Sequence, residues 1–100
     1  MADVLSEIEQ YIEDHLAESL EDLRRLTAIP SVSSKGEGIE DAANFVRELL
    51  TGAGFEAQVL PTNGHPVVYA DSGGEGKTML CYNHYDVQPA EPLDLWESPP

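Results

Sequence analysis

The sequence is poor in positive charge. Its 100 residues contain 5 Lys and Arg against 19 Asp and Glu, which gives a formal net charge of −14. A protein that binds nucleic acid through the phosphates needs a basic face, so this balance excludes general nucleic-acid binding. It also disfavours docking on an anionic membrane leaflet, because such docking requires clusters of Lys and Arg. We therefore expect neither nucleic acid nor a membrane among the partners.

The excess of acidic residues has two explanations. It is either the ordinary solvated surface of acidic helices, or an adaptation to high salt, where counter-ions screen the repulsion between carboxylates. The scarcity of lysine, with only Lys35 and Lys77 in the chain, favours the second explanation slightly. The sequence leaves both open.

Long apolar runs and cysteine pairs are also missing. No apolar run is longer than that of residues 79–82, which falls far short of the roughly 20 residues that a membrane span needs. The N-terminus is acidic from its third residue and lacks the basic and apolar regions of a secretory signal. The single cysteine, Cys81, cannot form an internal disulfide, which fits a reducing compartment. These absences predict a soluble cytoplasmic protein.

Two segments have the periodicity of helices. Between residues 5 and 26, apolar side chains recur at steps of three and four, with acidic residues early and two arginines late, as the helix dipole favours. Pro30 makes the helix end before it. A second apolar stripe covers residues 39–50, after a loop of small and polar residues at 31–38. The sequence therefore predicts two amphipathic helices in its first half.

Three strands are expected in the second half. Residues 55–59 alternate between apolar and polar, Asn63-Gly64 marks a chain reversal, and residues 67–71 form the returning strand. Residues 78–82 are apolar after the first, which is typical of a strand covered on both faces in an α/β sheet. Two helices followed by three strands predict the α/β class.

His84 and Asp86 follow directly on the last predicted strand. In open α/β sheets, ligands bind beyond the carboxyl ends of the strands. In extended backbone, residues two apart project to the same side, about 6.5 Å from each other. A neutral imidazole is a good zinc ligand, and a nearby carboxylate can fix its tautomer and orientation. The pair is thus the candidate metal site, although the spacing alone also fits an ordinary surface loop.

The sequence around His84 resembles the zinc-dependent exopeptidase family. This family includes carnosine-type dipeptidases, aminoacylases, acetylornithine deacetylase and succinyl-diaminopimelate desuccinylase. The resemblance is carried by residues 79–89 (MLCYNHYDVQP) with Leu95-Trp96, and by residues 29–33 (IPSVS) after the first helix. With the second helix it covers essentially the whole chain. The run from His84 to Pro89 together with Trp96 is the most specific part and leans toward the dipeptidase branch.

The resemblance implies an incomplete metal site. Residues 1–100 would be the N-terminal portion of one three-layer α/β/α metallopeptidase catalytic domain. His84 would bind one of two zinc ions, with cobalt or manganese as alternative metals. Asp86 would be the catalytic carboxylate that orients the His84 imidazole. Asn83 replaces the glycine usual before the histidine, which we expect to alter packing. The family's bridging aspartate, glutamate pair and later ligands have no match here, so we expect the 100 residues alone to be inactive. We also expect them to fold poorly, because the predicted strand at residues 79–82 would lack the neighbouring strand and helices that cover it.

The implied activity of the complete enzyme is metal-dependent hydrolysis of dipeptides. One alternative is deacylation or desuccinylation of N-acyl amino acids at the same site, and another is a non-catalytic acidic interaction module that keeps the fold. The expected partners are a dipeptide or N-acyl amino acid substrate, and a second copy in a homodimer formed through a region outside these residues.

Overall fold

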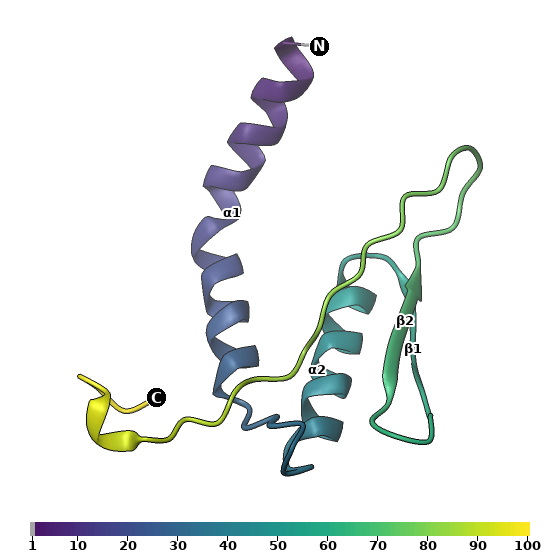
Figure 1. Ribbon diagram of the computed structural model, residues 1–100. Helices are drawn as coiled ribbons and strands as arrows, with labels where there is room; N and C mark the ends of the chain where they lie inside the picture. Colours follow the sequence, from purple (N-terminus) through teal and green to yellow (C-terminus); the bar gives the residue numbers. More distant parts are fainter. Residues whose placement is uncertain (1) are drawn as a thin grey trace.

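Two helices precede a two-stranded sheet in the structure, a computed structural model that describes residues 2–100 (Figure 1). The elements are α1 (Ala2–Ala28), α2 (Ile39–Gly52), β1 (Glu56–Leu60), β2 (Val67–Asp71) and the short 3-10 helix η1 (Leu93–Leu95). Both helices and the first two strands form where the apolar periodicity predicts them. The α/β class predicted from the sequence is confirmed.

Helix α1 stands apart from the other elements along most of its length (Figure 1). It ends where the sequence predicts, because Pro30 has no backbone N–H to continue the ladder. Its apolar stripe remains about half exposed, at 51–56% for each of Leu5, Ile8, Ile12, Leu16, Leu20 and Leu23. Near its C-terminal end, the Arg25 guanidinium lies 4.8 Å from the centre of the Phe45 ring of α2. Packing therefore fixes only the last turns of α1 against the rest of the described chain.

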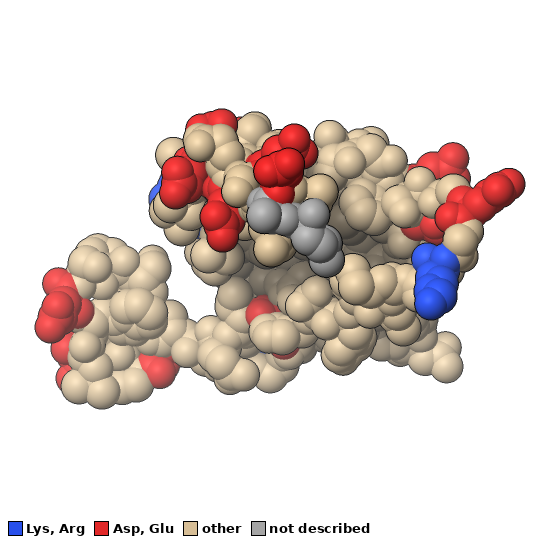
Figure 2. Space-filling model, turned by 90° about the horizontal axis from the view of Figure 1, so that it is seen from above, with Lys and Arg blue, Asp and Glu red and all other residues tan. Residues whose placement is uncertain are grey.

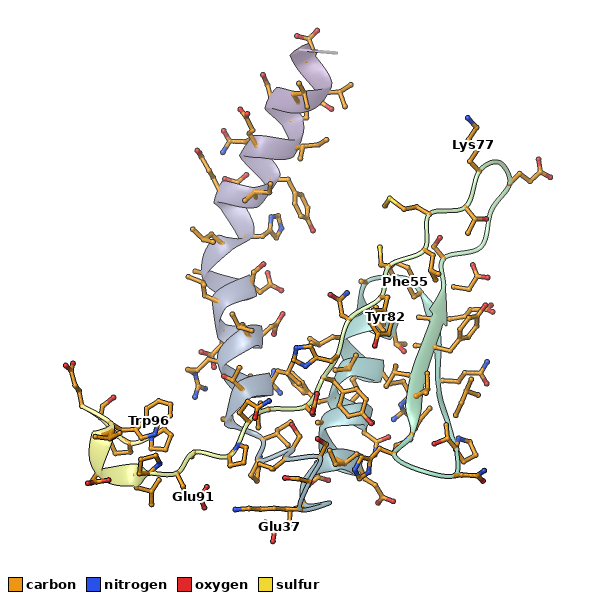
Figure 3. All side chains as sticks on the ribbon, in the orientation of Figure 1. Glu37, Phe55, Lys77, Tyr82, Glu91 and Trp96 are labelled. Carbon is orange, nitrogen blue, oxygen red and sulfur yellow. The ribbon has the colours of Figure 1, made fainter. Side chains whose placement is uncertain are left out.

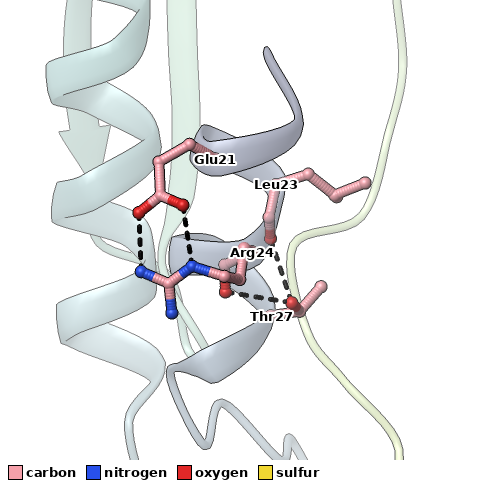
Figure 4. A network of polar contacts seen from close by, with 4 residues as sticks. All are labelled: Glu21, Leu23, Arg24 and Thr27. Carbon is pink, nitrogen blue, oxygen red and sulfur yellow. Dashed lines mark hydrogen bonds and ion pairs between the residues drawn. The ribbon is translucent and has the colours of Figure 1, made fainter. Parts of the chain in front are cut away.

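The last turns of α1 also carry a local polar network (Figure 4). Arg24 donates two hydrogen bonds to Glu21, from Nε at 2.8 Å and from Nη2 at 2.6 Å. The Thr27 hydroxyl donates to the carbonyl oxygens of Leu23 and Arg24. The hydrogen bond from Arg24 lowers the pKa of Glu21. Because both side chains of the ion pair are solvent-exposed, its contribution to the stability of the protein is small.

Helix α2 packs on the sheet of β1 and β2. The strands are antiparallel, with Ala57 opposite Ala70 and Val59 opposite Val68. These four side chains are half-buried, whereas the residues between them are exposed. Burial thus alternates along both strands, as predicted for residues 55–59, and separates a half-buried face toward α2 from a solvent face.

The most buried residues lie where the loop after α1 meets the start of α2. Fully or nearly fully buried residues are Ser31, Val32, Ile39, Ala42 and Ala43. The two alanines let the loop approach the helix closely, because they present no side chain beyond Cβ. The loop that follows α1 is therefore held against α2 by packing, and this loop supports the candidate site described below.

Gly38 allows this close approach. Its φ is +68°, and a Cβ added there would lie 2.7 Å from the carbonyl oxygen of Pro30. Gly36 has a similar φ of +71°, but a Cβ there would meet nothing within 4 Å. We expect Gly36→Ala to destabilise the complete gene product by roughly 1–3 kcal/mol through backbone strain. For Gly38→Ala we expect about 1–3 kcal/mol more from overpacking. Thermal or urea unfolding of both variants measures the difference, and equal losses would contradict this account of Gly38.

The third predicted strand does not form. Residues 78–82 belong to no strand, and Met79, Leu80 and Tyr82 are 85–91% exposed. The free cysteine of this segment, Cys81, is exposed as well. Figure 3 shows Tyr82 on the chain that returns from the loop at Lys77. The prediction was wrong for this structure because a strand requires a neighbouring backbone, and β1 and β2 pair only with each other within residues 2–100.

Acidic side chains are spread over several parts of the face in Figure 2 rather than gathered in one cluster. Such a distribution is compatible with both explanations of the net charge of −14. Among the residues that the structure describes, no helix is long and apolar enough to cross a membrane.

Candidate metal centre

The segment that carries His84 and Asp86 is held by the loop after α1. The buried Ser31 donates its hydroxyl to the carbonyl oxygen of Tyr85 at 3.2 Å, across 54 residues of sequence. The Val87 N–H donates to the carbonyl oxygen of Ser31 at 3.0 Å, and Val32 forms a parallel bridge with Val87. Backbone bonds therefore place the 84–86 segment beside residues 31–33.

The turn between β1 and β2 provides a second anchor. The Tyr85 hydroxyl donates to the carbonyl oxygen of Pro66 at 2.6 Å. The ring of His65 lies with Nε2 2.8 Å from the carbonyl oxygen of Ser33, so this nitrogen must be the donor. Burial is the main cause that raises the pKa of Tyr85, which keeps its phenol protonated as a donor. The hairpin thus fixes both segments that meet at the candidate site.

His84 and Asp86, the predicted pair, are brought together. The Nδ1 atom of His84 lies 3.0 Å from Oδ1 of Asp86 and 3.2 Å from the backbone oxygen of the same residue. A backbone carbonyl oxygen only accepts hydrogen bonds, and so does an oxygen of an ionised carboxylate. Nδ1 therefore carries the proton in the neutral ring. Nε2 is then the unprotonated nitrogen and makes no hydrogen bond to any residue from 2 to 100. The His84 side chain is 81% exposed, so this lone pair is available to a metal ion.

A second hydrogen bond fixes the other oxygen of the carboxylate. The Ser33 hydroxyl donates to Oδ2 of Asp86 at 2.8 Å. This bond is the largest cause that lowers the pKa of Asp86, with the hydrogen bond from His84 acting in the same direction and burial opposing both. Asp86 is therefore ionised at neutral pH and can accept the Nδ1 proton of His84.

The pair fits one corner of a metal centre. Within the described part of the chain, no group of three His, Cys, Asp or Glu side chains is arranged to hold a metal ion. A catalytic zinc ion normally takes three protein ligands. His84 with its carboxylate partner has the chemistry of one such ligand, and the others would have to come from residues other than these.

Two other polar contacts join residues outside the pair. Trp96 donates its indole N–H to the carbonyl oxygen of Ala90 at 2.7 Å. This hydrogen bond closes the loop that contains η1. Lys35 and Glu91 form an exposed ion pair at 3.1 Å. Two shallow hollows lie along α2 and the hairpin turn, and neither includes His84 or Asp86. The His84 side chain of the candidate centre is 81% exposed, so the imidazole lies at the surface of this part of the molecule.

Sequence reasoning found His84 and Asp86 but missed the roles of Ser33 and His65. Ser33 belongs to the IPSVS segment that carried the family resemblance, so a signal for it was present. Its contact with Asp86 spans 53 residues, which local periodicity cannot reveal. His65 gave no signal beyond its place in a turn.

Comparisons with known proteins point to metallopeptidases. No family model matches the chain. The Cys-Gly metallodipeptidase DUG1 of Saccharomyces cerevisiae is 30% identical to it, over 100% of this chain and 24% of the relative. A succinyl-diaminopimelate desuccinylase of Herminiimonas arsenicoxydans is 32% identical over 75% of this chain and 19% of the relative.

A solved structure agrees with these relatives. The M20 family metallo-carboxypeptidase Sso-CP2 from Sulfolobus solfataricus matches 80% of this chain and 20% of its own, with a TM-score of 0.69 and 44% identity. The chain thus spans about a quarter or less of the length of each of these proteins.

Proposed function

The chain is homologous to a part of the M20 metallopeptidases in sequence and in fold, and from this premise we propose that residues 1–100 form the N-terminal portion of such an enzyme's catalytic domain. The complete enzyme would hydrolyse peptide bonds in dipeptides with the help of a bound metal ion. The observation that carries this proposal is the His84 imidazole, oriented by Asp86 and with Nε2 facing solvent.

His84 would bind a zinc ion through Nε2, as one ligand of a centre with two zinc ions. Asp86 would accept the Nδ1 proton, which keeps the ring in the tautomer that binds metal and makes it a stronger ligand. A zinc ion held there would supply a Lewis acid for the scissile carbonyl and for the attacking water. The remaining ligands and the general base would come from other residues of the full-length enzyme.

A second candidate activity is removal of the acyl group from an N-acyl amino acid. It is favoured by the similarity to succinyl-diaminopimelate desuccinylases, one of which is 33% identical over 82% of this chain. The same metal chemistry would serve both reactions, because each hydrolyses an amide bond. Residues that bind the two ends of the substrate would determine which of the two reactions the enzyme catalyses.

A cytoplasmic location and a homodimer through residues outside this chain stay predictions from the sequence.

Assay of the complete gene product against a substrate panel tests the function. The panel contains dipeptides, including Cys-Gly, together with N-acetyl and N-succinyl amino acids. We expect hydrolysis of at least one dipeptide, complete loss after chelation, and recovery on addition of zinc. Hydrolysis of N-succinyl substrates alone would select the second activity. A protein that binds no metal and hydrolyses nothing in the panel would overturn the enzyme assignment and leave the non-catalytic module.

A further inference from the structure

We propose that Ser33 is a positioning residue of the metal centre: its hydroxyl fixes the Asp86 carboxylate so that the other carboxylate oxygen holds the His84 imidazole with Nε2 facing outward. The inference rests on the proposed function and adds a residue to it. Ser33 would not touch metal or substrate. It would act through Asp86, and Asp86 through His84.

The two oxygens of Asp86 have separate partners. Oδ2 accepts from Ser33 at 2.8 Å, and Oδ1 lies 3.0 Å from Nδ1 of His84. The terminal torsion of an aspartate is broad, so a carboxylate held at one oxygen alone can rotate. The hydrogen bond from Ser33 removes this freedom. Oδ1 is thereby kept in the direction of the histidine ring.

The histidine ring depends on this carboxylate because little else restrains it. Its side chain is 81% exposed, and the Asp86 side chain is 33% exposed. The hydrogen bonds of the ring within residues 2–100 are those from Nδ1 to the two Asp86 oxygens. An exposed ring without packing is oriented only by its hydrogen bonds. A change that frees the carboxylate should therefore reach the metal through the ring.

Ser33 itself is presented from a fixed position. It follows Val32, which is 8% exposed and bridges to Val87. Its own carbonyl oxygen accepts from His65 of the hairpin turn at 2.8 Å. The backbone of Ser33 is thus held on both sides. Its hydroxyl can therefore fix the position of the Asp86 carboxylate.

The neighbouring serine provides a matched control. Ser34 lies in the same loop and is also exposed, but its hydroxyl makes no hydrogen bond with the described residues. Ser34→Ala removes the same oxygen atom one position away. Any effect of Ser33→Ala that Ser34→Ala lacks therefore comes from the contact with Asp86 and not from the composition of the loop.

The test uses the complete gene product, stripped of metal and titrated with Co²⁺ while the visible absorption of the bound ion is recorded. Removal of a direct partner of a metal ligand costs about 10–100-fold, and Ser33 acts one step further away through Asp86. We therefore expect Ser33→Ala to weaken Co²⁺ binding by about 10-fold, at the low end of that range, and to change the absorption spectrum. The value of kcat should fall more than KM changes. Ser33→Thr, which keeps the hydroxyl, and Ser34→Ala should bind Co²⁺ like the wild type. The unfolding midpoint of the metal-free protein should be the same in all four proteins.

Two results would overturn the role of Ser33. One is a Ser33→Ala variant whose Co²⁺ affinity, spectrum and kcat stay within twofold of the wild type. The other is an equal loss in Ser33→Ala and Ser33→Thr with a lowered unfolding midpoint, which would mean a merely structural role. Failure of the proposed function looks different, because the wild type itself would then bind no Co²⁺ and hydrolyse no substrate.

Discussion

His84→Ala in the complete gene product is expected to lose bound metal and turnover together. The substitution deletes Nε2, the one unprotonated imidazole nitrogen that the pair presents to solvent. Removal of a partner of a metal ligand lowers metal affinity or activity about 10–100-fold. Removal of the ligand itself should therefore lower kcat/KM by more than about 100-fold. Metal content by atomic absorption and dipeptide hydrolysis, measured on the same samples, give the two values.

His15→Ala is the matched control for this prediction. His15 lies on α1, stacks on Tyr11 with ring centres 3.9 Å apart, and has no contact with the pair. The control should keep wild-type metal content and turnover. If the His84 variant behaves in the same way as the His15 variant, His84 is not a ligand.

Asp86→Ala is expected to reduce activity more than metal content. The variant loses the carboxylate that fixes the tautomer of His84, and a loss of about 10–100-fold in activity follows from the removal of such a partner. The backbone oxygen of residue 86, 3.2 Å from Nδ1, remains as an acceptor. The ring should therefore keep part of its orientation, and metal should still bind at a raised concentration. Metal titration and kcat measured in saturating zinc separate the two effects.

Asp86→Asn and Asp94→Ala complete this experiment. Asp86→Asn keeps an acceptor oxygen but loses the charge, so its activity should lie between the wild type and Asp86→Ala. Asp94 is an exposed carboxylate of η1, and its removal should change nothing. An Asp86→Ala variant with wild-type kcat would show that the carboxylate has no part in the reaction.

The local elements of the fold were predictable because their causes are local. Apolar side chains at steps of three and four define α1 and α2, and Pro30 ends the first of them. Alternation at residues 55–59 and the turn at Asn63-Gly64 indicate β1 and the strand that returns as β2, which together form the hairpin. Each of these signals acts within a few residues of the chain.

Local sequence signals could not show whether residues 78–82 form a strand. Its apolar composition describes a segment that is covered on both faces, but a sequence pattern does not supply the cover. In the structure the segment has no neighbouring strand, and Leu80 is 89% exposed. The expectation that the isolated 100 residues fold poorly agrees with this exposure and stays a prediction.

In the candidate site, too, contacts between residues close in sequence were predictable and contacts between distant residues were not. His84 and Asp86 lie two residues apart, so the extended backbone alone puts their side chains on one side. Ser33, His65 and Tyr85 act across 53, 32 and 19 residues respectively. Such contacts depend on how the loop, the hairpin and the 84–86 segment pack together, which no local pattern encodes.

A crystal structure of the complete gene product, with anomalous scattering recorded at the zinc edge, tests the central claim most directly. The account predicts an anomalous peak about 2.0–2.1 Å from Nε2 of His84, with Nδ1 directed at Asp86. A zinc-loaded, active protein whose anomalous peaks all lie away from His84, with Nε2 in contact only with solvent, would contradict it.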